Sequence, residues 1–231
     1  MKEIQTSETI RLGIILALSG GFMDAYSYIC RGQVFANAQT GNMLLFGVHL
    51  SSGNWPMALH YATPVFAFAM GIAIAAMVRF KMKDKSLIHW RQITVFFEAV
   101  ILLGVAFIPL SNNLLANSLT SFACGMQVES FRKIHGNGIA TTMCIGNLRN
   151  ATQNLCHYIE KRDKKSLKKS ILYYGIILFF IVGAVIGNIV IGYLKTRAII
   201  VCSVLLGLAF IIMFADNLEK GRNHGKKVSL Q

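Results

Sequence analysis

The sequence is poor in charged residues. Asp, Glu, Lys and Arg together make up 14% of its 231 residues, whereas a soluble domain carries about 25%. Hydrophobic residues make up 54%, and they gather in runs that fit about 20 residues per membrane span. This balance excludes a secreted disulfide scaffold, a disordered chain and an ordinary soluble enzyme. It predicts an all-α polytopic membrane protein.

Sites for metals, redox chemistry or catalysis are also missing. The five cysteines form no C-x-x-C pair, and no Cys/His pair has zinc spacing, so we expect no disulfide and no metal. The chain contains no P-loop, no dinucleotide fingerprint, no His-Glu-x-x-His and no serine nucleophile motif. We therefore expect no cofactor and no enzymatic activity.

Long apolar runs are what the sequence does have. Six of them are long enough to span a membrane, at about 10–29, 57–80, 91–110, 112–131, 170–194 and 197–215. Two further stretches, 43–50 and 144–155, are too short to span, and each follows an irregular polar segment. We expect these two stretches to form broken or re-entrant short helices.

The two halves of the chain resemble each other. At an offset of 105 residues, four positions of the first half match the second: Gly20 with Gly125, Asp24 with Glu129, Gly41 with Gly146 and Asn42 with Asn147. At an offset of 112 residues, Gly71 and Ala75 match Gly183 and Gly187, small-residue pairs suited to close helix crossing. We predict a single transmembrane domain, 1–215, built of two repeats at about 10–110 and 112–215, with a basic tail at 216–231.

The distribution of positive charge predicts the topology. Lys and Arg gather in 79–91, 161–169 and 220–227 and are absent from 51–56 and 110–114. By the positive-inside rule the first three segments and both termini are cytoplasmic. Each repeat then crosses the membrane three times, so the two repeats are inverted. Lys195 and Arg197 are exceptions, because they fall in an expected outer turn.

The net charge of +13 needs no nucleic-acid partner. Orientation in the membrane, together with contact to anionic lipid head groups, accounts for the basic residues.

Inverted repeats with broken helices are typical of many carriers and some channels. Irregular backbone at membrane depth is tolerated only where it is buried in protein or lines a wet cavity. Thr40 or Thr142 is a candidate cap for the short helix that follows it, and both helix N-termini would then face one common region, suited to an anionic or dipolar ligand. The polar residues of the two irregular segments are our candidate binding residues: Asn37, Gln39, Thr40, Asn42, Thr141, Thr142 and Asn147. The alternative is that both segments are only packing turns.

Three acidic residues, Asp24, Glu98 and Glu129, fall within expected spans, where carboxyl groups by default mark a proton or ion pathway. We therefore add them to the candidate binding residues. The alternative role is structural: Glu129 can pair with Arg132 at helical i,i+3 spacing, and Glu98 can snorkel toward the membrane surface.

Asp24 is expected to face protein. Gly20 lies about one helical turn before it, so another backbone can approach that face, and the nearest candidate along the chain is 37–45. Two partners are available to the carboxyl group, the free N–H groups near 40–42 or the guanidinium of Arg31.

The segment from Gly20 through Asp24 to Tyr28, followed by Val34-Phe35 and Gln39-Thr-Gly-Asn42, resembles the opening signature of the YoaK-like family of bacterial membrane proteins, domain of unknown function 1275. In the second half, Gly125-Met-Gln127 followed by Thr141-Thr142 and Gly146 also resembles the family pattern. The sequence departs from that pattern at 144–146, where a Thr-Gly pair is usual, and at Glu129, where a non-acidic residue is usual. The resemblance implies a six-helix protein of the bacterial inner membrane and supplies no substrate.

The leading functional hypothesis is a small-solute transporter, a carrier in preference to a channel, with proton or cation coupling through Asp24 and Glu129 as one version of it. The alternative is a non-transporting accessory or assembly protein of the membrane. The expected partners are the lipid bilayer and an unidentified small molecule or ion, and the sequence is compatible with a homo-oligomer. A wet, polar cavity between the two repeats would distinguish the two hypotheses, because an interaction protein would fill that space with apolar side chains.

Overall fold

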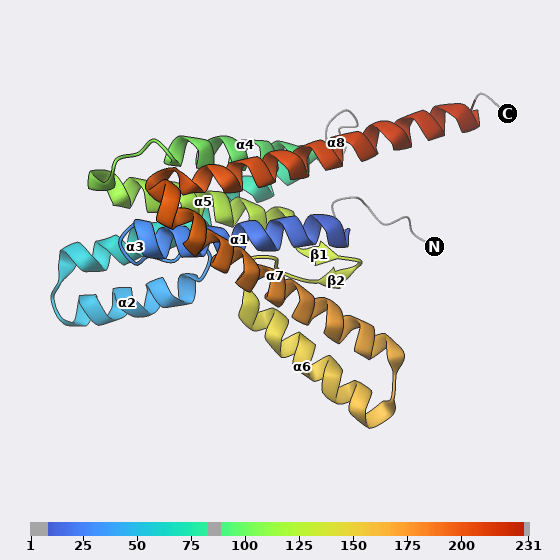
Figure 1. The fold of residues 1–231 in the computed structure, drawn as a ribbon, viewed down its shortest axis with the longest axis horizontal. Helices are drawn as coiled ribbons and strands as arrows, with labels where there is room; N and C mark the ends of the chain where they lie inside the picture. The colour runs from blue at the N-terminus through green and yellow to red at the C-terminus, as the bar shows by residue number, and fades with distance from the viewer. Residues whose placement is uncertain (1–8, 83–88, 229–231) are drawn as a thin grey trace.

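The computed structural model describes residues 9–82 and 89–228, and for 216–228 it describes the backbone only. The described chain is almost entirely helical (Figure 1), apart from a small antiparallel hairpin of β1 (Lys133–Ile134) and β2 (Asn137–Gly138). The α-helices are α1 (Ile10–Cys30), α2 (Gln39–Ser51), α3 (Trp55–Met82), α4 (Trp90–Val105), α5 (Asn113–Ser130), α6 (Cys144–Lys161), α7 (Lys164–Leu194) and α8 (Ile200–Val228), and the 3₁₀ turns are η2 (Leu110–Asn112) and η3 (Lys195–Ile199).

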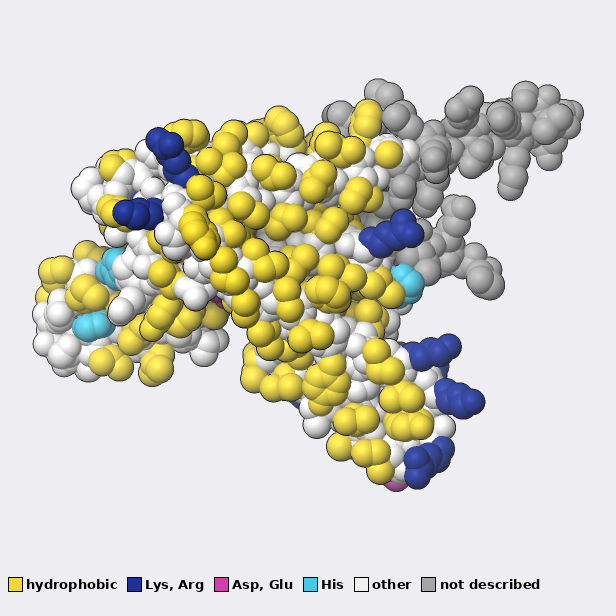
Figure 2. Space-filling view, in the orientation of Figure 1, with side chains coloured by type: hydrophobic (Ala, Val, Ile, Leu, Met, Phe, Trp, Pro, Cys, Tyr) yellow, Lys and Arg dark blue, Asp and Glu magenta, His cyan; other side chains and the backbone are white. Residues whose placement is uncertain are grey.

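Three of the described stretches are long and apolar enough to cross a membrane. They are Ile10–Cys30, Trp55–Met82 and Lys164–Ala215. The last of these contains α7 and the first part of α8, joined by the turn η3. Large hydrophobic side chains cover much of the outer surface (Figure 2), and Phe66, Phe80, Ile145 and Tyr193 are among the most exposed. An apolar surface of this extent is suited to lipid rather than to water.

The helices pack in corresponding pairs. α1 runs along α7, and α3 runs along α5; α2 folds back on α3, and α6 folds back on α7. α4 packs against both α5 and α8, and α8 also contacts α1. The main hydrophobic core lies among α1, α4, α5 and α8, where Leu16, Phe22, Leu102, Ala123 and Leu206 are buried together.

Glycine allows backbone contact at the two principal crossings. At the crossing of α1 and α7, a Cβ on Gly21 would overlap the carbonyl oxygen of Phe180, and one on Gly183 would overlap that of Leu18. The crossing of α3 and α5 repeats this arrangement, with Gly71 against the carbonyl oxygen of Phe122 and Gly125 against that of Phe68. Close approach through small residues is the usual basis of helix association in membranes.

α2 and α6 both begin near the middle of the molecule and run toward opposite ends (Figure 1). The turns from α2 to α3, from α4 to α5 and from α7 to α8 lie at the left of Figure 1. The turn from α6 to α7 lies at the right, as do the first residues of α1 and the last of α8. Figure 2 shows dark-blue basic side chains clustered at the tip of the α6–α7 hairpin.

Several expected boundaries were wrong. The first short helix is longer than 43–50, because α2 already begins at Gln39, and the second continues six residues past 155, to Lys161. Most of the basic segment 161–169 is helical rather than loop, since α7 begins at Lys164. The tail beyond 215 continues α8 as far as Val228. Local charge places a segment near water but does not prevent it from being helical.

The start of α7 has a local cause. The carboxylate of Asp163 accepts hydrogen bonds from the backbone N–H of Lys165 and of Ser166 and from the Ser166 hydroxyl group. These bonds, led by the one from the hydroxyl, lower the pKa of Asp163 below its usual range. An aspartate at the N-cap satisfies amides that have no partner within the helix.

The other basic segment, 79–91, is divided between two helices. Arg79 and Lys81 lie on the last turn of α3, and Arg91 lies on the first turn of α4. Lys83 and Lys85 lie outside the described residues.

The glycine crossings predict a position-dependent cost on α7. Gly183→Val should lower stability by about 1–3 kcal/mol or more, because the added side chain forces α1 and α7 apart. Gly192→Val is the matched control, since nothing lies within 4 Å of a Cβ at Gly192. Thermal unfolding of the detergent-solubilised variants measures both effects. Equal losses at the two positions would contradict the close crossing.

Candidate solute-binding site

The turn between α1 and α2 is closed by a side chain from inside α2. The Asn42 Oδ1 atom accepts a hydrogen bond from the backbone N–H of Phe35 at 3.0 Å, and its Nδ2 atom donates to the Phe35 carbonyl oxygen at 2.7 Å. The same Nδ2 also donates to Gln39 Oε1, and Gln39 Nε2 donates to the carbonyl oxygen of Ala36 at 2.7 Å. The amide group of Asn42 therefore replaces backbone pairing that a continuous helix would supply.

The turn that precedes α6 uses the corresponding asparagine. Asn147 Nδ2 donates to the carbonyl oxygen of Ala140 at 2.6 Å, seven residues earlier, which is the separation between Asn42 and Phe35. Gln127 of α5 joins this turn to α1, because its Nε2 atom donates to the Leu16 carbonyl oxygen and to the Thr141 hydroxyl oxygen. Both Gly-Asn pairs thus belong to equivalent turns.

The expected threonine caps are absent. The N-cap of α2 is Ala38 and that of α6 is Met143, and neither helix has a side-chain hydrogen bond at its N-cap. Thr40 instead lies within the first turn of α2, and Thr142 precedes the N-cap of α6. The prediction was wrong because the asparagine bonds set where each helix begins. They leave the first amides of both helices without a side-chain cap.

A cavity of about 870 Å³ lies where the beginnings of α2 and α6 meet. Its wall includes residues 37–41 and 43 from the first turn and 142–145 from the second, together with side chains of α1, α3 and α7. Five of the predicted candidates line this cavity: Asp24, Asn37, Gln39, Thr40 and Thr142. The structure therefore brings both irregular segments to one place.

Asp24 lies at the centre of this arrangement. Its Oδ1 atom accepts the backbone N–H of Asn37 at 2.7 Å, just before α2 begins. Asn37 Nδ2 in turn donates to the Gly20 carbonyl oxygen at 3.1 Å, and the side chain of Thr142 packs against Gly20 from the other turn. The expectation that Asp24 faces the segment 37–45 is confirmed. The amide that it binds is that of Asn37, three residues before the expected range of 40–42.

Arg31, the alternative partner of Asp24, is bonded elsewhere. It is fully buried at the end of α1, and its Nε atom donates to the Tyr26 hydroxyl oxygen at 2.8 Å. Its Nη2 atom donates to the Val105 carbonyl oxygen at 3.1 Å, and Asn117 Nδ2 donates to the carbonyl oxygen of Arg31. Arg31 therefore ties the end of α1 to the helices on either side of the α4–α5 turn.

Glu129 lies outside the cavity. Its Oε1 atom is 3.0 Å from Nη1 of Arg79 on α3 and 3.5 Å from Nη2 of Arg132, the i,i+3 pair expected from the sequence. At the helix crossings the residue that corresponds to Gly125 is Gly21 rather than Gly20. Glu129 thus forms an ion pair at the end of α5, an environment unlike that of Asp24.

Glu98 on α4 does not snorkel. Its side chain is 0% exposed, and neither carboxyl oxygen has a hydrogen-bond partner among the residues that the structure describes. It faces the core among α4, α5 and α8 rather than the cavity at Asp24. The remaining candidates, Asn42, Thr141 and Asn147, are buried behind the cavity wall and hold the two turns in place.

Two groups of site residues were not found from the sequence. Phe35, Phe68 and Phe180 bring aromatic surface to the cavity from three different segments, and no local pattern relates them. Cys124 on α5 lies close to Asn37 and to the carboxyl groups of both Asp24 and Glu98. Its position immediately before Gly125, at a helix crossing, was the available signal.

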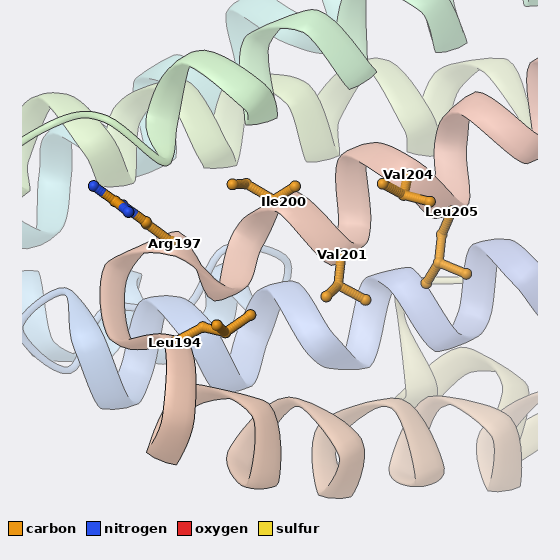
Figure 3. A pocket seen from close by; sticks show the side chains of 6 residues that line it. All are labelled: Leu194, Arg197, Ile200, Val201, Val204 and Leu205. Atoms are coloured by element: carbon orange, nitrogen blue, oxygen red, sulfur yellow. The ribbon is translucent and has the colours of Figure 1, made fainter.

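A second cavity, of about 300 Å³, lies beside η3 and is apolar (Figure 3). Leu194 and four aliphatic residues of α8 line it, and Arg197 lies at one end of the row. It brings no convergent polar groups, so the cavity at Asp24 is the better candidate. Among the described residues, no cluster of three or more His, Cys, Asp or Glu side chains could hold a metal ion.

Long apolar helices and a lipid-suited surface define an all-helical membrane protein, and comparisons with known proteins agree. A family model described as a protein of unknown function, DUF1275, matches residues 12–212. The chain belongs to this family, as the resemblance of its first motif indicated. It is 24% identical over 181 residues to a protein of Bacillus subtilis (strain 168) named UPF0700 transmembrane protein YoaK, an alignment that covers 74% of this chain and 79% of that one. No solved structure matches.

The bonds of Asn42 predict a large effect from a small change. Asn42→Asp keeps the shape but removes both Nδ2 bonds and places a carboxylate oxygen near the Phe35 carbonyl oxygen. A buried group left without a partner costs about 1–3 kcal/mol, and more when it is charged. Asn154→Asp is the matched control, because Asn154 donates only to Asn150 within α6. Thermal unfolding in detergent should show a clear loss for the first variant and little for the second; the reverse order would refute the role of Asn42.

Proposed function

We propose that the protein is a small-solute transporter, a carrier rather than a channel, and that the cavity beside Asp24 holds the solute. The observation that carries the proposal is that α2 and α6 begin at one cavity of about 870 Å³. Interrupted helices whose ends meet at a cavity inside the membrane are the usual binding architecture of secondary carriers. The proposal requires no enzymatic step.

Six spans and inverted repeats are part of this proposal. The contact of α1 with α7 corresponds to that of α5 with α3, and the contact of α4 with α5 corresponds to that of α8 with α1. Such corresponding contacts are expected of two repeats, α1–α4 and α5–α8, that are related by a two-fold axis in the membrane plane. The opposite directions of α2 and α6 support inversion (Figure 1).

We further propose that both termini and the α6–α7 turn are cytoplasmic. This orientation is supported by the basic residues of that turn and by the absence of Lys and Arg from the turn at 51–56. Lys195 and Arg197 lie at the other end, in η3, and weigh against it by only two charges.

The cavity wall indicates the chemistry of the solute. Phe35, Phe68 and Phe180 offer aromatic surface, and Gln39 and Thr40 lie at the first turn of α2. The positive ends of two helix dipoles favour an anionic or dipolar group. A small organic molecule with one such group and an apolar body fits this combination.

Transport predicts that blocking the cavity abolishes uptake. Thr40 is exposed to the cavity on the first turn of α2, so Thr40→Trp should reduce uptake to the level of cells without the protein. Thr152→Trp, at an exposed position on α6 outside the cavity wall, should retain uptake. A screen of labelled metabolites and toxic analogues in cells carrying each form measures this. A screen in which no compound distinguishes the wild type from the Thr40→Trp variant contradicts transport.

Native cysteines test both the wetness of the cavity and the orientation. Cys144 lines the cavity, whereas Cys156 is exposed twelve residues further along α6. Twelve helical residues span about 18 Å, which exceeds half the thickness of the bilayer's hydrocarbon core, about 15 Å. A charged, membrane-impermeant thiol reagent should label Cys144 if the cavity is wet. It should label Cys156 only in inside-out vesicles. The protein used for labelling carries Cys30→Ser, which removes the other half-buried thiol that the reagent could reach.

The same labelling separates the accessory-protein alternative. An unlabelled Cys144, with Cys156 labelled in the same vesicles, indicates a cavity filled by lipid or by a partner and removes the basis for transport. Labelling of Cys156 from outside intact cells reverses the proposed orientation.

A further inference from the structure

Glu98 occupies an unusual place for a carboxyl group. It is fully buried on α4, and within residues 9–82 and 89–228 neither of its oxygen atoms has a hydrogen-bond partner. No ion pair is recorded for it within the part of the chain that the structure describes. A charged carboxylate without a partner in an apolar interior costs several kcal/mol or more. Glu98 therefore holds a proton in the state that the structure shows.

On one side of Glu98, hydroxyl groups lead to the end of α4 and α5. Thr94 lies one helical turn before Glu98, on the same face of α4. The Ser130 hydroxyl group donates to Thr94 Oγ1 at 2.8 Å, and Thr94 Oγ1 donates to the Arg91 carbonyl oxygen at 2.9 Å. Arg91 Nε donates to the Ser130 carbonyl oxygen at 2.8 Å, at the half-exposed end of this row. Thr94 and Ser130 thus form a bonded pair of hydroxyl groups between the face of α4 that carries Glu98 and the start of α4, and among the described residues neither hydroxyl is hydrogen-bonded to Glu98.

On its other side, Glu98 is close to the cavity at Asp24. Cys124 on α5 is a neighbour of both carboxyl groups and of Asn37, whose side chain lines that cavity. The Asn37 Oδ1 atom is buried without a partner. Cys202 on α8 also lies beside Glu98, and its thiol donates to the Ser19 carbonyl oxygen of α1. Cys124 therefore interacts electrostatically with both Glu98 and the bonded Asp24.

We propose that Glu98 is a proton-carrying site, which exchanges its proton with the α4–α5 surface through Thr94 and Ser130, and that it couples proton movement to occupation of the Asp24 cavity. The step is a proton transfer only. The step requires the Thr94 hydroxyl group to rotate from the Arg91 carbonyl oxygen to Glu98; Thr94 Oγ1 then accepts the Glu98 proton as its own proton passes on, and the reverse transfer returns a proton to Glu98, with no oxidant or other reactant. This inference rests on the proposed transport function for its coupling part, but the exchange itself requires no solute.

The neighbours of Glu98 permit this role. The titratable groups that interact with it electrostatically are the thiols of Cys124 on α5 and Cys202 on α8; Cys202 donates to Ser19 of α1, and Cys124 also interacts with Asp24 of α1. Neither thiol carries charge that would hold Glu98 ionised. Asp24, in contrast, is bonded to the backbone of the turn, so its carboxylate is committed to the structure.

Infrared spectroscopy of the protein in lipid vesicles tests the exchange directly. The wild type should show a carbonyl band of a protonated carboxylic acid that is missing from Glu98→Gln and that shifts when the vesicles are transferred to D₂O. Thr94→Val should retain the band and slow its shift by about tenfold or more. Thr94→Ser, which restores the hydroxyl group, should return the rate to that of the wild type.

Each other outcome overturns the proposal. An identical spectrum for the wild type and Glu98→Gln means that Glu98 is ionised. A band that never shifts in D₂O means a sealed structural acid, and equal rates in Thr94→Val and the wild type mean that the hydroxyl row is not the route. Thr120→Val, which removes another buried hydroxyl of α5, controls for packing loss. Because no solute is present, a failed uptake screen leaves these results unaffected, and failure here leaves the Thr40→Trp result unaffected.

Discussion

A chain that leaves the helical conformation inside a membrane must still pair its backbone N–H and C=O groups, because lipid offers no substitute for water. The connections from α1 to α2 and from α5 to α6 both meet this constraint with side chains. Asn42 and Asn147 return to carbonyl groups seven residues earlier, and Asp24 accepts an amide that no helix uses. The candidate site exists because these side chains pair the backbone groups that the interrupted helices leave free. The two turns therefore supply both the polar groups of the site and its shape.

The glycine crossings determine where the interruptions lie. α1 and α7 approach at Gly21 and Gly183, and α5 and α3 approach in the same way, so the beginnings of α2 and α6 both lie against α1 at Gly20. Gly20 shows this directly: its carbonyl oxygen accepts a bond from Asn37 of one turn, while Thr142 of the other turn packs against it. Stability and site geometry thus depend on the same backbone contacts.

The carboxyl groups of Asp24, Glu98 and Glu129 show how environment divides one residue type among different roles. Asp24 is bonded to backbone at a cavity, Glu129 is bonded to two arginines near a helix end, and Glu98 is buried without a partner. Their spacing along the chain could not separate these roles. The offset of 105 residues made Asp24 and Glu129 look equivalent, yet the crossings align Gly21 with Gly125, one residue away from that match. A shift of one residue turns a helical side chain by about 100°, enough to change its neighbours.

The sequence by itself determined the class of protein, the approximate places of the helices and both interruptions, because hydrophobic runs and paired Gly-Asn turns are local signals. It also placed Asp24 next to the segment after α1, since that segment is close along the chain. Only the tertiary structure decided that the second turn lines the same cavity, that Arg31 bonds to the α4–α5 turn rather than to Asp24, and that Glu98 is buried in the core. Each of these depends on helices far apart in sequence, whose approach is governed by packing at glycine and by buried polar pairing. The spacing of small residues marks a helix face for close crossing but not the helix that will pack there, and buried polar pairing leaves no periodic pattern in the chain.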